Sequence, residues 1–180
     1  DSPPSGEREG VKHYDRFAGR VLFPIYNITG RVIGFGGRAL KKEVKAKYVN
    51  SPESEIYHKS NVLYGMNLAR KTVATEDNCF LVEGYMDVIS MHTAGIENAV
   101  ASSGTSLTVE QILLIKRYTE NITIMYDGDA AGIKASFRGI DMILEEGLNV
   151  RVVLFPEGHD PDSYSRQHSS EEVKSFIQKN

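Results

Sequence analysis

Residues 79–87 read Cys-Phe-Leu-Val-Glu-Gly-Tyr-Met-Asp, which is a short apolar run that ends at an acidic residue. Residues 122–129 follow the same plan, because Ile-Thr-Ile-Met-Tyr is followed by Asp-Gly-Asp. Short apolar runs rich in β-branched and aromatic residues are typical of buried strands. Each run precedes a segment with helical character, at residues 84–95 and 130–146. We therefore expect two strand–helix units.

Two further strands extend this pattern. Residues 98–101 (Asn-Ala-Val-Ala) and 150–155 (Val-Arg-Val-Val-Leu-Phe) have a similar composition, and Thr108 with Gln111 forms a capping-box signature for a helix between strands. The apolar face of the helix after residue 130 is predicted to consist of Ile133, Phe137, Ile140 and Leu144. The alternation predicts an α/β fold, with a parallel four-stranded sheet and helices on both faces.

The first third of the chain has a different pattern. Residues 20–27 and 31–36 are rich in β-branched and aromatic residues and are separated by a turn, which predicts a β-hairpin. Glycines at positions 34, 36 and 37 weaken the second strand but allow another part of the chain to approach its backbone closely. We predict a partial basic α+β subdomain over residues 1–60 and an α/β domain over residues 61–180.

Charge is distributed unevenly between these two parts, although the net charge of the chain is only −3. Residues 1–60 contain eleven Lys and Arg against seven Asp and Glu, a net charge of +4. Residues 61–180 contain ten against seventeen, a net charge of −7. A basic surface neutralises phosphates, whereas clustered carboxylates bind hard cations. The small net charge therefore does not exclude a nucleic-acid partner.

Several classes of protein are excluded by composition. The single cysteine, Cys79, excludes a disulfide framework and a zinc site with several cysteines. No run of about 18 apolar residues is present, so we expect no transmembrane helix and no membrane partner. Residues 1–6 lack the apolar stretch of a signal peptide.

Acidic residues follow three of the four predicted strands. They are Glu83 after the first strand, Asp127 and Asp129 after the third, and Asp160 and Asp162 after the fourth. In an open parallel sheet, binding sites form at the carboxyl ends of the strands. Carboxylates gathered at one edge repel one another unless a cation binds, and a set of oxygen ligands suits Mg²⁺ or Mn²⁺ rather than zinc.

Each of these groups also has a structural explanation. Glu83 would stabilise the start of the following helix, and Asp-Gly-Asp at 127–129 and Asp-Pro-Asp at 160–162 are common in turns. Residues 102–106 fit a phosphate-binding loop and, equally well, a strand-to-helix turn. The site prediction therefore depends on the joint occurrence of the carboxylates. No aromatic cluster in the sequence suggests base-specific stacking, so we expect weak base-specific recognition.

A strand that ends in Glu83-Gly84, followed two strands later by Asp127-x-Asp129, resembles the Toprim module of bacterial primases, topoisomerases of types IA and II and some nucleases. Further short sequence motifs are typical of one family in this group, the bacterial DnaG-type primases. These motifs lie at residues 16–17, 21–25, 30–38 (Gly-Arg-Val-Ile-Gly-Phe-Gly-Gly-Arg), 47–53 (Lys-Tyr-Val-Asn-Ser-Pro-Glu), 58–59, 63–65, 83–87, 99–102 and 160–162. The resemblance begins at about residue 14 and implies a Toprim-type sheet.

This resemblance implies that the chain takes part in RNA primer synthesis on a single-stranded DNA template, by nucleotidyl transfer with two metal ions. It implies that the catalytic metal ligands are Glu83, Asp127 and Asp129, supported by Asp87, Asp160 and Asp162. It implies that template and nucleotide bind at Arg16, Arg38, Lys47, Asn50 and Lys59. The implied enzyme is a DNA-directed RNA polymerase.

The resemblance also implies cofactors and partners. The metal would be Mg²⁺ or Mn²⁺, with zinc only in a separate N-terminal domain of the family. The implied partners are single-stranded DNA, ribonucleoside triphosphates, the RNA–DNA hybrid, and a replicative helicase that binds a separate C-terminal domain. Members act in the bacterial cytoplasm at the replication fork. We therefore expect this sequence to be part of a longer polypeptide.

Three alternative functions are kept open. A topoisomerase or nuclease with a Toprim module would share the carboxylates but not the sequence motifs of the predicted hairpin. A haloacid dehalogenase-type phosphatase would also use Asp127-x-Asp129, but Ala131 stands where that class has Thr or Val, and Glu83 would have no role. A non-catalytic module would bind nucleotide or DNA phosphates through Arg38 and Lys47.

Overall fold

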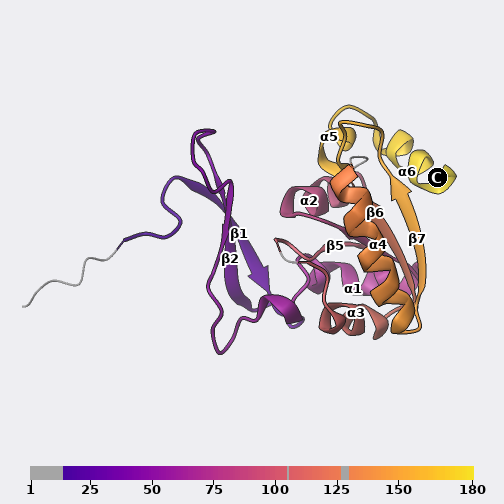
Figure 1. Ribbon diagram of the computed structural model, residues 1–180, viewed down its shortest axis with the longest axis horizontal. Helices are drawn as coiled ribbons and strands as arrows, with labels where there is room; N and C mark the ends of the chain where they lie inside the picture. The colour runs from indigo at the N-terminus through magenta and orange to yellow at the C-terminus, as the bar shows by residue number, and fades with distance from the viewer. Residues whose placement is uncertain (1–13, 105, 127–129) are drawn as a thin grey trace, which may run out of the picture.

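The chain forms two sheets that lie side by side (Figure 1). A computed structural model describes residues 14–104, 106–126 and 130–180, and within these residues the side chains of 126 and 130–136 are left out of the description. Among the described helices, none is both long enough and apolar enough to cross a lipid bilayer.

The larger sheet has four parallel strands in the order β5-β4-β6-β7. The strands are β4 (Cys79–Val82), β5 (Ala99–Ala101), β6 (Asn121–Tyr126) and β7 (Asn149–Leu154). The predicted α/β class and the four parallel strands are confirmed. Because β6 lies between β4 and β7, the carboxyl ends of these three strands meet at one edge of the sheet.

Helices cover both faces of this sheet, as predicted. One face packs against α1 (Met66–Thr75), α3 (Val109–Lys116) and α4 (Ala130–Glu145), and the other packs against α2 (Tyr85–Thr93) and α6 (Ser170–Lys179). Adjacent residues of β4 show the alternation, because Leu81 belongs to the first apolar cluster and Val82 to the second. A sheet with both faces covered explains why its two strands β4 and β5 are apolar throughout.

The predicted capping box at the start of α3 is present. Thr108 Oγ1 accepts a hydrogen bond from the Gln111 N–H, and Gln111 Oε1 accepts one from the Thr108 N–H, each at 3.2 Å. The fully buried Gln111 amide also donates to the carbonyls of Lys59 and Val62. It thereby fixes the short 3₁₀ helix η1 (Lys59–Asn61) against α3.

The apolar face predicted for α4 is wrong in part. Phe137 is 64% exposed and Leu144 is 54% exposed, whereas Ile143 is fully buried and Ile140 packs beside it. The buried face therefore runs through Ile140 and Ile143. Periodicity alone placed it incorrectly because apolar residues occur on two sides of this helix. Ile133, the fourth predicted position, lies outside the described side chains.

The smaller sheet is antiparallel with the strand order β1-β2-β3. Its strands are β1 (Arg20–Tyr26), β2 (Val32–Ala39) and β3 (Tyr48–Asn50). The hairpin formed by β1 and β2 confirms the prediction, and Pro24 lies on the edge strand, where a missing N–H is tolerated. The third strand, β3, was not predicted because it has only three residues.

Glycines in β2 bring the two sheets together. A Cβ atom at Gly36 would overlap the ring of Tyr85, a buried residue at the start of α2. The Tyr85 ring belongs to the same apolar cluster as Phe23 and Ile25 of β1. The predicted close approach to the glycine-rich strand is therefore confirmed, and its partner is an aromatic ring of the parallel-sheet unit.

We expect Gly36→Ala to lower the free energy of unfolding by about 1–3 kcal/mol, because the added methyl group overpacks a filled interface. Gly34→Ala is the matched control on the same strand, since its Cβ would lie 3.2 Å from the ring of Tyr57 and needs only a small adjustment. Urea denaturation of both variants measures the difference. Equal midpoints for the two variants would show that the Gly36–Tyr85 approach does not limit packing.

Candidate metal and nucleic-acid site

Glu83 and Asp87 lie at the carboxyl end of β4, where the chain enters α2. Glu83 directly follows the strand, and Asp87 is the third residue of the helix. Asp87 is 8% exposed, and its Oδ2 atom accepts a hydrogen bond of 2.9 Å from the Gly84 N–H. This bond stabilises the start of α2 and fixes the orientation of the Asp87 carboxylate.

Asp162 lies beside Asp87, although 75 residues separate them in the sequence. The backbone N–H of Asp162, in α5 (Pro161–Ser165), donates to Asp87 Oδ1 at 3.2 Å. The Asp162 carboxylate is 14% exposed, and its Oδ1 atom accepts hydrogen bonds from Ser90 Oγ at 2.6 Å and Arg166 Nε at 2.9 Å. The structure thus brings two of the predicted supporting ligands together.

Asp160, which lies next to this contact in the sequence, stabilises the start of α5. It is the N-cap of α5, and its Oδ1 atom accepts a hydrogen bond of 2.6 Å from the Ser163 N–H. Pro161 occupies the first helical position, where a missing N–H costs nothing. The cap uses one carboxylate oxygen of Asp160.

Asp127 and Asp129, two of the three predicted catalytic ligands, lie outside the described residues. The strand that precedes them, β6, lies between β4 and β7. Among the described residues, no group of three or more His, Cys, Asp or Glu side chains has the geometry of a metal site. The described part of the predicted ligand set is Glu83, Asp87, Asp160 and Asp162.

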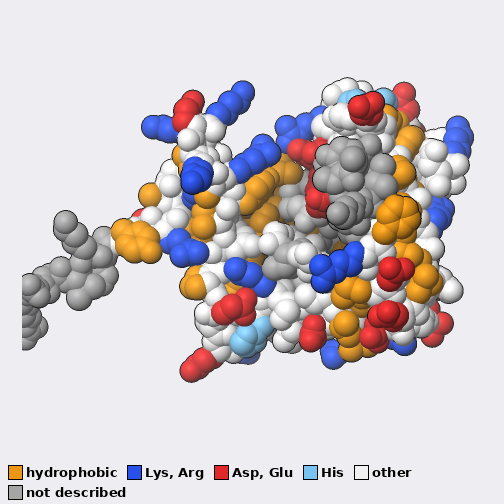
Figure 2. Space-filling view, viewed as in Figure 1, with side chains coloured by type: hydrophobic (Ala, Val, Ile, Leu, Met, Phe, Trp, Pro, Cys, Tyr) orange, Lys and Arg blue, Asp and Glu red, His pale blue; other side chains and the backbone are white. Residues whose placement is uncertain are grey.

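The predicted basic residues lie mainly on the smaller sheet. Arg38 is on β2, and Lys47 immediately precedes β3. Their cationic groups lie 5.9 and 6.0 Å from the centroid of the Tyr48 ring, within the range of a cation–π interaction. Figure 2 shows basic side chains over this sheet and acidic side chains on the neighbouring side of the parallel-sheet unit.

The two other predicted cations, Arg16 and Lys59, have different neighbours from Arg38 and Lys47. Arg16 Nε donates to the Asn50 carbonyl at 3.1 Å. Lys59 begins the turn of η1, and its N–H donates to Glu53 Oε1 at 3.1 Å. Another cation, Arg20, was not predicted as a site residue but donates to the Ala46 carbonyl at 2.9 Å and so holds the lysine-rich loop against the sheet.

Both basic and acidic residues affect the pKa of the Tyr48 phenol. Burial raises the pKa of its phenol, Arg38 opposes this increase, and the negative charges of Asp87, Asp162 and Asp160 add to it. Because electrostatic interactions weaken with distance, Arg38 and the three carboxylates all lie near enough to the Tyr48 phenol to change its pKa. Such an arrangement is suited to a phosphate bound with its metal ion.

Sequence reasoning missed the aromatic residues at this junction. The Tyr85 ring stacks on Phe23 with ring centroids 5.0 Å apart, and Tyr64 meets it edge-on at 4.7 Å. Tyr48 is 6.1 Å from Tyr85 and, at 38%, is the exposed member of the group. Phe23 and Tyr85 are buried in this cluster, and the expectation of weak base-specific recognition stays a prediction. These rings come from four separate segments, so no local sequence pattern indicated the cluster.

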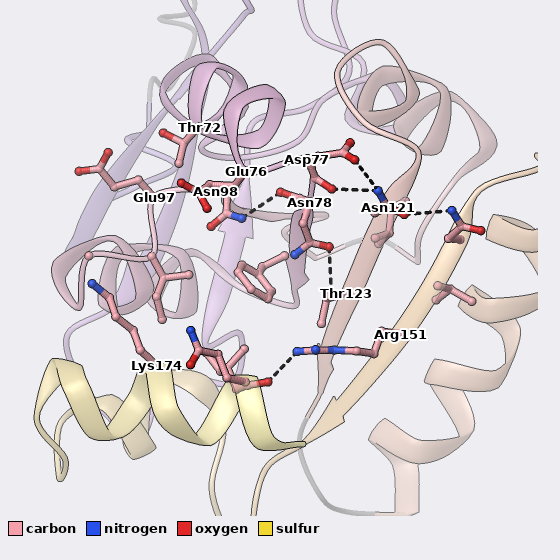
Figure 3. Close-up of a pocket in the computed structure, with 18 residues that line it drawn as sticks. Thr72, Glu76, Asp77, Asn78, Glu97, Asn98, Asn121, Thr123, Arg151 and Lys174 are labelled. Carbon is pink, nitrogen blue, oxygen red and sulfur yellow. Dashed lines mark hydrogen bonds between the residues drawn. The ribbon is translucent and has the colours of Figure 1, made fainter.

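A cavity of about 710 Å³ lies elsewhere, at the amino ends of β4, β6 and β7 (Figure 3). Its polar groups bind mostly one another. Asn121 Nδ2 donates to the Asp77 carboxylate, and Thr123 Oγ1 donates to Asn78 Oδ1. This cavity is at the end of the sheet opposite to the carboxylates, so it is not the site that the acidic residues form.

Two family models match the chain. Residues 5–70 match the model described as the N-terminal domain of the DNA primase catalytic core, and residues 80–165 match a Toprim-like model. The chain is 48% identical over 172 residues to a DNA primase of Halalkalibacterium halodurans, covering 95% of this chain and 28% of that protein. It is 46% identical over 165 residues to one of Clostridium acetobutylicum, covering 92% and 27%. The chain thus spans somewhat more than a quarter of these relatives.

Solved structures show the same similarity. The zinc-binding and RNA polymerase domains of the Aquifex aeolicus primase superpose with a TM-score of 0.88 at 39% identity, covering 99% of this chain and 43% of that one. A DnaG primase catalytic domain bound to single-stranded DNA gives a TM-score of 0.83 at 43% identity, covering 92% and 54%. The similarity includes the hairpin segment as well as the Toprim-like segment, and the chain belongs to the bacterial DnaG-type primase family, as a segment of the catalytic core.

Proposed function

We propose that this segment supplies the metal site of a primase that makes short RNA primers on single-stranded DNA. The observation that carries the proposal is geometric. Asp87 and Asp162 are fixed side by side at the carboxyl edge of the parallel sheet. Tyr85, which begins the same helix as Asp87, lies 6.1 Å from Tyr48, beside which Arg38 and Lys47 lie. The similarity to a primase catalytic domain bound to single-stranded DNA supports the assignment of the template.

The available ligands fit a hard divalent cation. The acidic side chains at the carboxyl edge offer only oxygen atoms, which favour Mg²⁺ or Mn²⁺ over zinc. We assign the principal ligands to Glu83, Asp127 and Asp129, with support from Asp87, Asp160 and Asp162. When bound, the ions supply positive charge that activates the 3′-hydroxyl of the primer and neutralises the α-phosphate.

The chain's own residues bind and orient the reactants. In the proposed reaction, the 3′-oxygen forms a bond to the α-phosphorus of a ribonucleoside triphosphate, and the bond to the leaving pyrophosphate breaks. The Glu83 carboxylate accepts the proton of the attacking hydroxyl as a general base. The hydrogen bonds to Asp87 and Asp162 hold these two carboxylates in place before the substrates arrive.

The cations bind phosphate groups. Arg38 and Lys47 flank the exposed Tyr48, which places positive charge on the path of a polynucleotide along the smaller sheet. We also assign template and nucleotide binding to Arg16, Asn50 and Lys59, because these residues lie in the sequence motifs that resemble those of the primase family. Contacts of this kind give affinity that depends on salt concentration but carry little sequence information.

Organisation and context follow from the family. We propose a boundary between the basic subdomain and the Toprim domain at residues 60 and 61. Ribonucleoside triphosphates and the RNA–DNA hybrid would bind between the two parts, whereas zinc and the replicative helicase would bind other domains of the longer protein. The place of action would be the replication fork in the bacterial cytoplasm.

A primer-synthesis assay tests the proposed function. The full-length primase that contains this sequence is incubated with a single-stranded DNA template, the four ribonucleoside triphosphates and Mg²⁺. We expect short RNA products that require all three components. Omission of the template is the control, and the absence of RNA products under every condition would contradict the proposal.

We expect Arg38→Gln to weaken template binding by about tenfold at low salt, because one phosphate contact is lost. The slope of log affinity against log salt concentration should become about 0.7 units shallower, since a single-strand contact contributes about that amount. Fluorescence anisotropy with a labelled oligonucleotide at several salt concentrations measures both values. Arg117→Gln, at the exposed C-cap of α3, is the matched control, and equal slopes for the two variants would remove Arg38 from the template surface.

A further inference from the structure

The side chain of Asn50 connects the two sheets through a pair of hydrogen bonds. Its Nδ2 atom donates to the Ser103 carbonyl at 2.9 Å, and its Oδ1 atom accepts from the Tyr85 hydroxyl at 2.7 Å. Because the Ser103 carbonyl accepts but cannot donate, the orientation of the amide is fixed. Asn50 ends β3 of the smaller sheet, whereas both of its partners belong to the parallel-sheet unit.

Both hydrogen-bond partners of Asn50 are connected to Glu83, one through the sequence and one through a backbone hydrogen bond. Tyr85 is two residues after Glu83 in the sequence, and the Ser103 N–H donates to the Glu83 carbonyl at 3.1 Å. Ser103 has a positive φ of 51°, a conformation that few non-glycine residues adopt and that belongs to the turn presenting its carbonyl to Asn50. Asn50 therefore contacts the segment that carries Glu83 at two points.

The Tyr85 ring is held on every side. It is 3% exposed, stacks on Phe23, meets Tyr64 edge-on, and lies against Gly36 with no room for a side chain there. Because the bond from Asn50 Nδ2 to the Ser103 carbonyl orients the amide, Asn50 Oδ1 faces the Tyr85 hydroxyl, which donates to it. A ring this buried does not reach a substrate, so its contribution to the reaction is one of position.

We propose that Asn50, Tyr85 and Ser103 form a joint that sets the position of Glu83 relative to the basic surface of the smaller sheet. We call it the Asn50 joint. Arg38 and Lys47 lie around Tyr48, which is only two residues before Asn50 on β3. A shift at the joint therefore changes the separation between phosphate-binding cations and metal-binding carboxylates.

Catalysis depends steeply on such a separation. A misplacement of about 1 Å is enough to reduce the rate of an oriented reaction by about 100-fold. The importance of the joint for primer synthesis rests on the proposed function, but its role in fixing the two sheets does not. Tyr85 is accordingly a positioning residue, and Asn50 has this positioning task in addition to the contact with template or nucleotide proposed above.

A distance measurement tests the joint without reference to activity. Spin labels are attached to Val21→Cys on β1 and Glu171→Cys on α6, two exposed sites in regular elements on opposite sides of the joint. Cys79 is fully buried and its raised pKa keeps the thiol protonated, so it does not compete for the label. Double electron–electron resonance then gives the distribution of distances between the two sheets in this chain.

We expect Tyr85→Phe to broaden this distribution by about twofold, because one of the two hydrogen bonds of Asn50 is lost while the ring remains. Asn50→Asp should have a similar effect, since a carboxylate accepts from Tyr85 but cannot donate to Ser103. Tyr64→Phe is the matched control, because it removes a hydroxyl from the same cluster for which the described residues provide no hydrogen-bond partner. An unchanged distribution in both joint variants would overturn the proposal.

Kinetics in the full-length primase provides the second measurement. Tyr85→Phe should lower kcat about tenfold while the Kd for Mn²⁺ changes by less than twofold, because the carboxylates themselves are intact. A variant that merely folded less well would lose kcat and Mn²⁺ binding together. Wild-type protein without primer synthesis would contradict the proposed function, whereas full kcat in Tyr85→Phe would contradict the importance of the joint.

Discussion

Glu83→Gln is expected to reduce primer synthesis by about 10³-fold, which corresponds to about 4 kcal/mol of barrier height. Glutamine keeps the size of the side chain but removes the negative charge and the capacity to accept a proton. Both proposed tasks of Glu83, metal binding and general-base catalysis, are therefore lost together. Initial rates of RNA synthesis on single-stranded DNA measure the effect, with the template in excess.

Glu97→Gln is the matched control for this prediction. Glu97 is exposed and lies beside the cavity at the amino ends of the strands, so the same chemical change occurs at the other end of the sheet. Its activity should equal that of the wild type, and both variants should unfold at the wild-type temperature. A Glu83→Gln enzyme with more than a tenth of the wild-type rate would exclude Glu83 from the proposed chemistry.

Asp127→Ala should abolish primer synthesis to below the detection limit, a loss of about 10³-fold or more. The prediction follows from sequence position, since Asp127 comes directly after β6, the strand between β4 and β7. Alanine provides no ligand atom, so the proposed site would lose one of its three principal carboxylates. The same primer-synthesis assay detects the loss.

Asp141→Ala is the corresponding control, because Asp141 is an exposed residue of α4 and has no proposed role. Binding of Mn²⁺, followed by electron paramagnetic resonance, should weaken in Asp127→Ala and stay constant in Asp141→Ala. Retained RNA synthesis by Asp127→Ala would remove this residue from the mechanism.

The parallel sheet was predictable because its strands are short, mainly apolar runs that alternate with helical segments. Local signals were also reliable where backbone chemistry decides the structure, as in the capping box of Thr108 and Gln111. The face of α4 was not predictable in the same way, because Phe137 and Leu144 add a second apolar side to that helix. The short helix α5 was missed because Asp160 and Pro161 are equally frequent in turns.

The candidate site was predictable as a set of carboxylates but not as a geometry. Strand order alone places Glu83 near the carboxyl end of β6, whereas the contact between Asp87 and Asp162 depends on how α5 packs on α2. The glycines of β2 indicated that something approaches closely, but not that the partner is Tyr85. The tasks of Tyr85 and Asn50 arise from contacts between distant segments, which periodicity does not report.

Anomalous scattering from crystals soaked in Mn²⁺ tests the central claim most directly. A crystal of the chain is exposed to Mn²⁺, and diffraction is recorded at a wavelength where manganese scatters anomalously. We predict an anomalous peak bounded by carboxylate oxygens of Glu83, Asp127 and Asp129, with Asp87 and Asp162 alongside. A crystal that contains Mn²⁺ elsewhere but shows no anomalous density between these carboxylates would contradict the account.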